Sequence, residues 1–272
     1  MTLDPQMIAV MKKRATLTGR AGDVADLALD EIRNGYNAER VWWNEIKPEM
    51  HDVINTHVAG PVRDIPIRIY KPNDLDEGPT LLYLHGGGWI LGNLETHDRV
   101  MRLLADFSGA WVVGVDYALS PEYKFPVALN EVRAVLDWLQ AHGPDHGLDS
   151  AKLGIGGDSA GANLAVSVTQ LYHQQNPGLI QFLLLYYGAY GLTESASWQQ
   201  YGNAEFEFTR EEKEFYLTSY LGDAHDRNDP RFNVLKGDIG LLPRAFIAAA
   251  ECDPLQDDSI ALYKAMEREG RP

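Results

Sequence analysis

The stretch Gly157-Asp158-Ser159-Ala160-Gly161 joins a short apolar run, residues 153–157, to a helical segment that extends to about His173. The pattern G-x-S-x-G between a strand and a helix is typical of a nucleophile elbow, a sharp turn that presents a serine at the top of a sheet. Glycines on both sides let the chain turn tightly, and the start of a helix favours developing negative charge. The stretch therefore predicts an α/β fold with Ser159 as its nucleophile.

The glycines before the elbow leave one alternative, which is a nucleotide-binding loop. Gly154-Ile155-Gly156 begins a G-x-G-x-x-G pattern, but Ser159 occupies its last position. No acidic residue follows at the distance that a ribose contact requires. The pattern therefore disfavours a dinucleotide cofactor.

Strand-like and helical segments alternate on both sides of the elbow. Such alternation predicts βαβ units and a mostly parallel, twisted sheet with helices on both faces. The first two strands alternate apolar and polar residues and are expected to form a hairpin at the edge of the sheet. Seven strands are expected near residues 53–58, 65–70, 81–84, 111–115, 153–157, 182–186 and 245–251, with helices near 96–108, 127–140, 160–173 and 258–269.

Two helical segments lie outside this alternation. Residues 1–50 are predicted to hold one helix that starts at Asp4-Pro5 and a second helix from Asp23 to about Arg33. This segment is either a packing appendage or a cap that covers the substrate. Residues 51–272 then form the catalytic domain, and residues 193–226, too long for a plain connection, are expected to add a second cap-like insertion.

A glycine-rich loop, His85-Gly86-Gly87-Gly88-Trp89, follows the third strand. Consecutive glycines cost backbone entropy, so they indicate close approach or unusual backbone angles. In an acyl-transfer site the N–H groups of Gly87 and Gly88, with that of Ala160, would form an oxyanion hole. The alternative is a flexible loop. His85 is expected to hold the loop by hydrogen bonding and not to act as the catalytic base.

A carboxylate follows the seventh strand in the stretch Asp253-Pro254-Leu255. At that place it could orient a histidine and stabilise its imidazolium form. The alternative for Asp253 is a helix start. Asp257 and Asp258, which follow closely, are expected to be solvated.

The three motifs together resemble the hormone-sensitive-lipase family of α/β-hydrolases, which carries an HGGG loop, a GDSAG elbow and a DPL aspartate in this order. The stretch Asp116–Pro126 resembles the block between the first two motifs, and the likeness extends from Asp52 to the C-terminus. The resemblance implies an eight-stranded sheet and a carboxylic ester hydrolase without a cofactor. It assigns Ser159 as nucleophile and Asp253 as triad acid. The residues implied to support the motifs are His85, Gly86, Gly157, Asp158 and Gly161.

The resemblance fails at the catalytic histidine. In α/β-hydrolases the triad follows the order Ser, Asp, His, yet no histidine follows Asp253. We therefore expect this chain to stop before its last strand and base. Loss of a triad histidine typically costs about 10⁶-fold in kcat, so impaired turnover is expected. His225 is the best internal substitute, although a surface position is the simpler interpretation. The histidines stand at positions 51, 57, 85, 97, 142, 146, 173 and 225.

No metal site is expected among these histidines. His142 and His146 are four residues apart, but Gly143 and Pro144 between them would break the helix that a metal-binding pair needs.

Composition excludes several other classes of protein. The 272 residues are 45% hydrophobic and 23% charged, which excludes a disordered or collagen-like chain, and the single cysteine excludes a disulfide scaffold. A net charge of −15 would repel phosphate backbones and anionic membranes. The N-terminus lacks a secretory signal, and the longest apolar stretch is too interrupted to span a bilayer. A cytoplasmic protein with no nucleic-acid partner and no membrane span is expected.

The sequence thus predicts a serine carboxylesterase for short- to medium-chain esters, acting through an acyl-enzyme. Its expected partners are a small-molecule ester and, for a longer form of the chain, a second copy in a homodimer. Two alternatives remain open. One is a non-catalytic small-molecule binder of the same fold, and the other is an amidase or formamidase.

Overall fold

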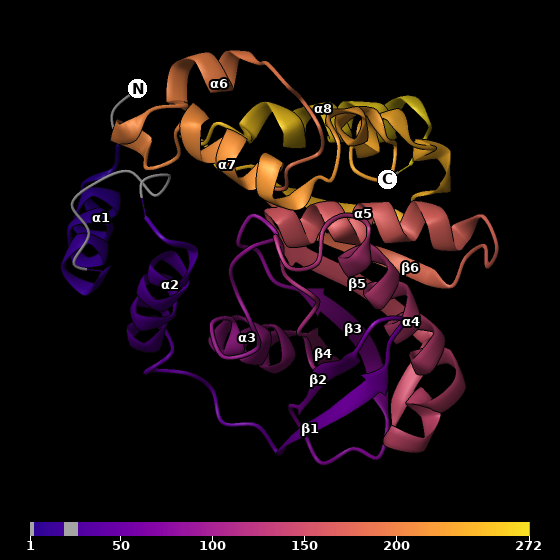
Figure 1. Ribbon diagram of the computed structural model, residues 1–272. Coiled ribbons are helices and arrows are strands. Elements are labelled where there is room, and N and C mark those ends of the chain that lie inside the picture. Colours follow the sequence, from indigo (N-terminus) through magenta and orange to yellow (C-terminus); the bar gives the residue numbers. More distant parts are fainter. Residues whose placement is uncertain (1–2, 19–26, 272) are drawn as a thin grey trace.

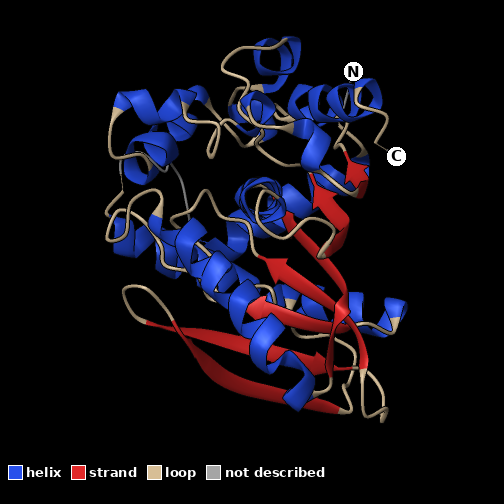
Figure 2. Cartoon of the chain, turned by 90° about the vertical axis from the view of Figure 1, so that its right-hand side faces the viewer, coloured by secondary structure: helices blue, strands red, loops and turns tan. Residues whose placement is uncertain are grey.

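A twisted sheet forms the centre of the molecule in the computed structural model (Figures 1 and 2), which describes residues 3–18 and 27–271, apart from the side chains of Thr18, Ala224 and His225. The strands in chain order are β1 (Asp52–Ala59), β2 (Asp64–Lys71), β3 (Gly78–Leu84), β4 (Trp111–Val115), β5 (Leu148–Asp158), β6 (Ile180–Tyr186) and β7 (Arg244–Ala248). Within the described residues these seven strands form one sheet in the order β1-β2-β4-β3-β5-β6-β7.

The strands from β3 to β7 are parallel, and the first two are not. β1 pairs antiparallel with β2, and β2 pairs antiparallel with β4. The predicted hairpin is therefore confirmed. Of its two strands only β1 lies at the edge of the sheet, because β2 also pairs with β4, where Ile67 faces Val115. The seventh strand is shorter than predicted and ends at Ala248, where the chain turns toward the next helix.

Helices cover both faces of the sheet, as the alternation predicted. They are α1 (Pro5–Thr18), α2 (Leu29–Trp43), α3 (Asp98–Ser108), α4 (Val127–His142), α5 (Ala160–His173), α6 (Ala196–Tyr201), α7 (Arg210–Tyr220) and α8 (Gln256–Arg268). Short 3₁₀ turns, Gly143–His146, Ala204–Phe206, Ala224–Asn228, Val234–Lys236 and Ile239–Leu241, connect some of them.

Alternate side chains of each strand face different helices. In β3, Leu82 and Leu84 join the large apolar core that α4, α5 and α8 complete. Leu81 and Tyr83 point to the other face and pack in a smaller core with Met101 of α3. This alternation is the two-residue period of a strand, and burial on both faces explains why the central strands are almost wholly apolar.

The second helix differs from its predicted bounds. It was expected to end near Arg33, but α2 continues to Trp43. The helix continues through Gly35 because Ile32 and Glu39, which lie two turns apart on one side, are both buried. The predicted start at Asp23 lies outside the described residues. In Figure 1, α1 and α2 lie side by side, beyond α3 from the sheet.

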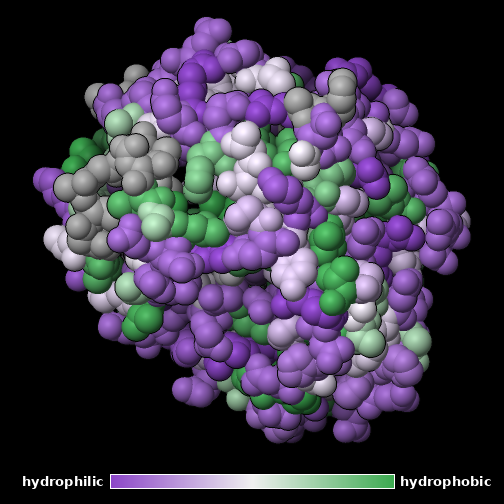
Figure 3. Space-filling view, viewed as in Figure 1, coloured by the Kyte–Doolittle hydropathy of each residue, from purple (hydrophilic) through white to green (hydrophobic). Residues whose placement is uncertain are grey.

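A second helical layer covers the carboxyl ends of the parallel strands (Figures 1 and 2). It contains α6 and α7, which come from the stretch predicted as an insertion. A capping box begins α7, since Thr209 Oγ1 accepts from the N–H of Glu212 at 3.1 Å and Glu212 Oε2 accepts from that of Thr209 at 2.9 Å. On the face shown in Figure 3, hydrophilic residues predominate and hydrophobic ones form scattered groups.

Candidate active site

Ser159 lies at a strained turn between β5 and α5. Its φ is +52° and its ψ is −116°, a combination that costs energy for any residue with a side chain. The turn brings the chain against the end of β3, where a Cβ at Gly161 would collide with the carbonyl oxygen of Leu84, and one at Gly157 would lie 2.5 Å from it. Only glycine fits at these two places, and Ser159 is left half-buried on the wall of a cavity.

The glycine-rich loop after β3 lies beside Ser159. Gly87 and Gly88 have φ values of +125° and +60° and line the same cavity as Ser159. The carbonyl oxygen of Gly87 accepts from the N–H groups of Ile90 and Leu91, at 3.1 and 2.9 Å. No described residue accepts a hydrogen bond from the N–H of Gly87, Gly88 or Ala160. Three donors thus stay available next to the serine.

Asp158 connects the elbow to this loop. Its Oδ1 accepts from the Tyr83 hydroxyl at 2.8 Å and from the N–H of Gly86 at 2.9 Å, while its Oδ2 lies 3.5 Å from Nε2 of His97. Burial acts to raise the pKa of Asp158, but His97 and the Tyr83 hydroxyl outweigh it and bring that pKa down to about 2. Asp158 is therefore an anion at neutral pH. Its partners Tyr83 and His97 carry no motif, and sequence analysis missed them.

His85 is enclosed below the loop. Its ring stacks on Tyr117, with centroids 4.3 Å apart, and its Nδ1 lies 2.9 Å from the carbonyl oxygen of Gly86. The Tyr117 hydroxyl donates to the carbonyl oxygen of His85 at 2.6 Å. Burial and the neighbouring His97 lower the pKa of His85 to about 3, so its imidazole is neutral at pH 7 and its contacts hold the loop.

Asp253 follows β7 and is half-buried. Its Oδ1 accepts from the N–H of Leu255 at 2.7 Å. Burial raises the pKa of Asp253, and this hydrogen bond from Leu255 opposes the increase. Among the described residues Asp253 does not line the cavity that contains Ser159, although Leu255 does. The structure therefore gathers Ser159, Gly87 and Gly88 at the cavity and leaves Asp253 outside the lining.

The expectation that Asp258 is solvated is wrong. Its side chain is only 1% exposed, and Oδ1 accepts from three successive N–H groups, those of Tyr190, Gly191 and Leu192, at 2.7, 2.9 and 3.1 Å. Burial raises the pKa of Asp258 to about 6, and these hydrogen bonds oppose the increase. The partners lie in the loop after β6, 66 to 68 residues earlier, so the local sequence carries no signal for them. Asp257 is also bound, through Oδ2 to the N–H of Ser197 at 2.9 Å.

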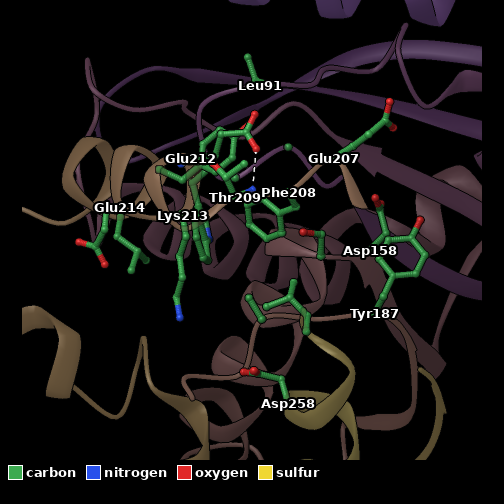
Figure 4. Close-up of a pocket in the computed structure, with 18 of the residues that line it drawn as sticks. Leu91, Asp158, Tyr187, Glu207, Phe208, Thr209, Glu212, Lys213, Glu214 and Asp258 are labelled. Atoms are coloured by element: carbon green, nitrogen blue, oxygen red, sulfur yellow. Dashed lines mark hydrogen bonds between the residues drawn. The ribbon is translucent and has the colours of Figure 1, made fainter. Parts of the chain in front are cut away.

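A cavity of about 750 Å³ lies over Ser159 (Figure 4). Its walls come from α1, α2, the glycine-rich loop, the loop after β6 and α7. Both segments predicted as cap material therefore border it. One part of the lining is aromatic or aliphatic and consists of Trp89, Trp198, Phe208, Leu217 and Phe232. In Figure 4, Asp158 and Tyr187 lie on one side of the cavity, and Glu212, Lys213 and Glu214 lie on the other.

The cavity lining contains no imidazole within the described part of the chain. His173 is tied to the carbonyl oxygen of Leu241 at 2.7 Å, and His146 packs on Trp138. The side chain of His225, the predicted substitute, lies outside the described residues. In the same part of the chain, no group of His, Cys, Asp and Glu could hold a metal ion, and no helix is long and apolar enough to cross a membrane.

Comparison with known proteins gives consistent relatives. Residues 81–272 match the family described as alpha/beta hydrolase fold. Acetyl esterases of Salmonella dublin and Salmonella enteritidis are each 40% identical over 251 residues, which cover 91% of this chain and 77% of those proteins.

Solved structures give the same result. A hyperthermophilic esterase from the archaeon Pyrobaculum calidifontis superposes with a TM-score of 0.94 at 30% identity, covering all of this chain and 87% of that one. A thermostable carboxylesterase cloned from a metagenomic library gives a TM-score of 0.87 at 31% identity, covering 90% of this chain and 85% of that one.

Proposed function

The chain belongs to the α/β-hydrolase fold family and is a carboxylic ester hydrolase, and from this premise we propose that it acts through an acyl-enzyme on Ser159. The observation that carries the proposal is the strained Ser159 on the cavity wall beside three N–H groups without acceptors among the described residues. A serine exposed in this way can reach an ester carbonyl, and free donors next to it can stabilise the oxyanion.

In the first half-reaction Ser159 Oγ attacks the carbonyl carbon of the ester. A new C–O bond forms, and the carbonyl oxygen takes the negative charge. The N–H groups of Gly87, Gly88 and Ala160 donate to it. Collapse of the tetrahedral intermediate breaks the bond to the leaving oxygen, which takes up a proton as it departs. Water then attacks the acyl-enzyme, releases the carboxylic acid and restores the Ser159 hydroxyl.

Proton transfer needs a base that Asp253 could orient. Asp253 lies outside the cavity lining, and its Oδ1 accepts from the N–H of Leu255. An imidazole placed between Asp253 and Ser159 would take the serine proton and pass it to the leaving group. Because the described cavity lining holds no imidazole, we infer that Ser159 is acylated slowly.

The two helical segments act as a cap in this proposal. Arg14 of α1 and Tyr36 of α2 border the cavity from one side, and Tyr216 of α7 borders it as well. The cavity, at about 750 Å³, has room for more than an acetyl group. Its aromatic part suits an apolar acyl chain, and the substrates proposed are esters of short to medium acyl chains.

The test is direct detection of the acyl group on Ser159. The protein is incubated with 4-nitrophenyl acetate and digested, and the peptide containing residue 159 is examined by mass spectrometry. We expect an added acetyl group in the native chain, its loss in Ser159→Ala, and its retention in Ser108→Ala, since Ser108 is an exposed serine at the end of α3. The proposal would be contradicted if Ser159→Ala and Ser108→Ala were acetylated at equal rates. It would also be contradicted if no acetyl group formed on the native chain or on either variant.

A further inference from the structure

Most of the cationic side chains that line the cavity have a carboxylate or carbonyl partner among the described residues, with one exception. Arg14 Nε lies 3.0 Å from Glu39 Oε1, and its Nη1 lies 2.5 Å from Glu207 Oε2. Arg227 Nη2 lies 2.7 Å from Glu214 Oε2. The ammonium group of Lys213 donates to the carbonyl oxygen of Thr193 at 2.9 Å.

The exception is Arg40 of α2, which lines the same cavity. Its guanidinium lies over the ring of Tyr36, 4.6 Å from the centroid. Its Nε is shielded from solvent and has no hydrogen-bond partner, and it forms no ion pair with any described carboxylate. Buried guanidinium donors that lack acceptors are costly, so this arrangement needs a reason.

The two carboxylates whose charges act on Arg40, those of Glu39 and Asp158, accept hydrogen bonds from other groups. Tyr36, Glu39 and Asp158 raise the pKa of Arg40 against the opposing effect of burial, so the group stays cationic. Glu39 Oε1, however, already accepts from Arg14 and from Trp43 Nε1, both at 3.0 Å. Asp158 Oδ1 accepts from Tyr83 and Gly86. Arg40 shares a side-chain hydrogen bond with Tyr36, and its Nε remains without an acceptor. A planar guanidinium in a partly desolvated cavity is suited to bind a carboxylate through two parallel hydrogen bonds.

Arg40 borders the cavity that contains Ser159, together with Asp158 and Tyr187. An ester that reaches Ser159 therefore lies in the cavity that Arg40 lines. Figure 4 places Tyr187 with Asp158, on the side opposite to Lys213 and Glu214.

We propose that Arg40 binds an anionic group of the substrate, so that the preferred substrates are esters that bear a carboxylate. This rests on the proposed function of Ser159, which fixes the place of the scissile bond. Long-range attraction cannot supply the preference, since the net charge of −15 repels anions. It must come from contact with Arg40.

The experiment measures binding without turnover. The probes are 3-acetamidobenzoate and acetanilide, two amides that differ by one carboxylate on the leaving-group side. Calorimetry on the native chain should give a dissociation constant about tenfold lower for the anion, as for a hydrogen bond to a charged group. Arg40→Met should abolish the difference, and Arg40→Lys should keep part of it. Arg227→Met is the matched control, because it removes one positive charge from the same cavity but from a paired arginine, and it should keep the preference.

Equal affinities of the native chain for the two probes would overturn the proposal. It would also be overturned if Arg40→Met, at unchanged Tm, lowered the affinity for both probes by the same factor. Failure of the proposed function gives a different result, because the anion preference in binding would persist while no acyl group forms on Ser159.

Discussion

The carboxylate of Asp158 accepts a hydrogen bond from the N–H of Gly86 at 2.9 Å, and this contact joins the two loops that carry the site. The elbow and the glycine-rich loop are 72 residues apart in the chain. They have to keep a fixed distance for Ser159 and its neighbouring donors to act on one carbonyl group. A buried anion with several donors provides this rigidity.

Replacing this anion should loosen the site and the fold. Asp158→Asn keeps an acceptor for one or two donors but removes the charge near His97. Since the pKa of Asp158 is lowered to about 2 in the folded protein, its ionisation stabilises the fold above pH 4, and this contribution is lost as pH falls toward 2. We expect Asp158→Asn to lower the free energy of unfolding at pH 7 by about 2 kcal/mol. Urea titration at pH 7 measures this, and an unchanged midpoint would contradict it.

Asp258 should give the opposite dependence on pH. Its pKa is raised to about 6 in the folded state, so the folded protein binds more protons than the unfolded one between about pH 4 and 6. Stability should therefore fall as pH rises through this range and stay lower above it. Asp258→Asn keeps Oδ1 for the three N–H groups of residues 190–192 and is always neutral.

We expect Asp258→Asn to be more stable than the native chain at pH 7, by about 1–3 kcal/mol, and equal to it near pH 3.5, below the pKa of about 3.9 in the unfolded chain. Urea titration at both pH values tests this. The control is Asp257→Asn, which changes the neighbouring half-buried carboxylate and should preserve the fall in stability between the two pH values. A persistent fall in Asp258→Asn would mean that another group causes it.

The close packing at the elbow predicts that alanine substitutions at two glycines, Gly161 and Gly154, will have different effects on the free energy of unfolding. At Gly161 a Cβ would collide with the carbonyl oxygens of Leu84 and His85, which are backbone atoms and cannot move away easily. Gly161→Ala should therefore cost at least about 2 kcal/mol of unfolding free energy. At Gly154, on the preceding strand, the nearest atom would be Leu81 Cδ1 at 3.5 Å, an ordinary contact. Gly154→Ala should change stability by less than about 1 kcal/mol. Urea titration of both variants measures this, and equal losses of unfolding free energy would show that the backbone around Gly161 can move to accept a Cβ.

The absence of an imidazole from the described cavity lining predicts chemical rescue. Free imidazole at high concentration should enter the cavity, accept the proton of Ser159 and speed the release of nitrophenol from 4-nitrophenyl acetate. A well-placed general base contributes about 10²-fold or more, and a diffusing one should recover a part of that.

Because imidazole also attacks this ester directly, Ser159→Ala in the same buffer is the reference for the rescue experiment. An imidazole effect of the same size in Ser159→Ala would exclude rescue at the serine. Saturable rescue in the native chain alone would support it.

The sequence was sufficient to predict the sheet and the elbow. Buried parallel strands are continuous apolar runs, and the G-x-S-x-G pattern has a meaning only at a strand-to-helix turn, so each prediction supported the other. The hairpin β1–β2 was visible in the alternation of Ile65, Ile67 and Ile69.

The interactions between distant parts of the chain could not be predicted. Asp258 looked solvated because its three donors belong to the loop after β6. Arg40 belongs to no motif and lies beyond Arg33, where its helix was expected to end, and only the cavity shows that it lacks a carboxylate partner among the described residues. Both depend on tertiary contacts that no local pattern encodes.

The ion pair between Arg14 and Glu207 has a consequence for the order in which the protein is made. These residues are 193 positions apart, so one anchor of the first helix is synthesised long after the helix itself. Contacts of such high sequence separation form late. On the ribosome, α1 must therefore wait for residue 207 before this ion pair can exist, and the cavity over Ser159 acquires the contact only after the strands β1 to β6 have been synthesised.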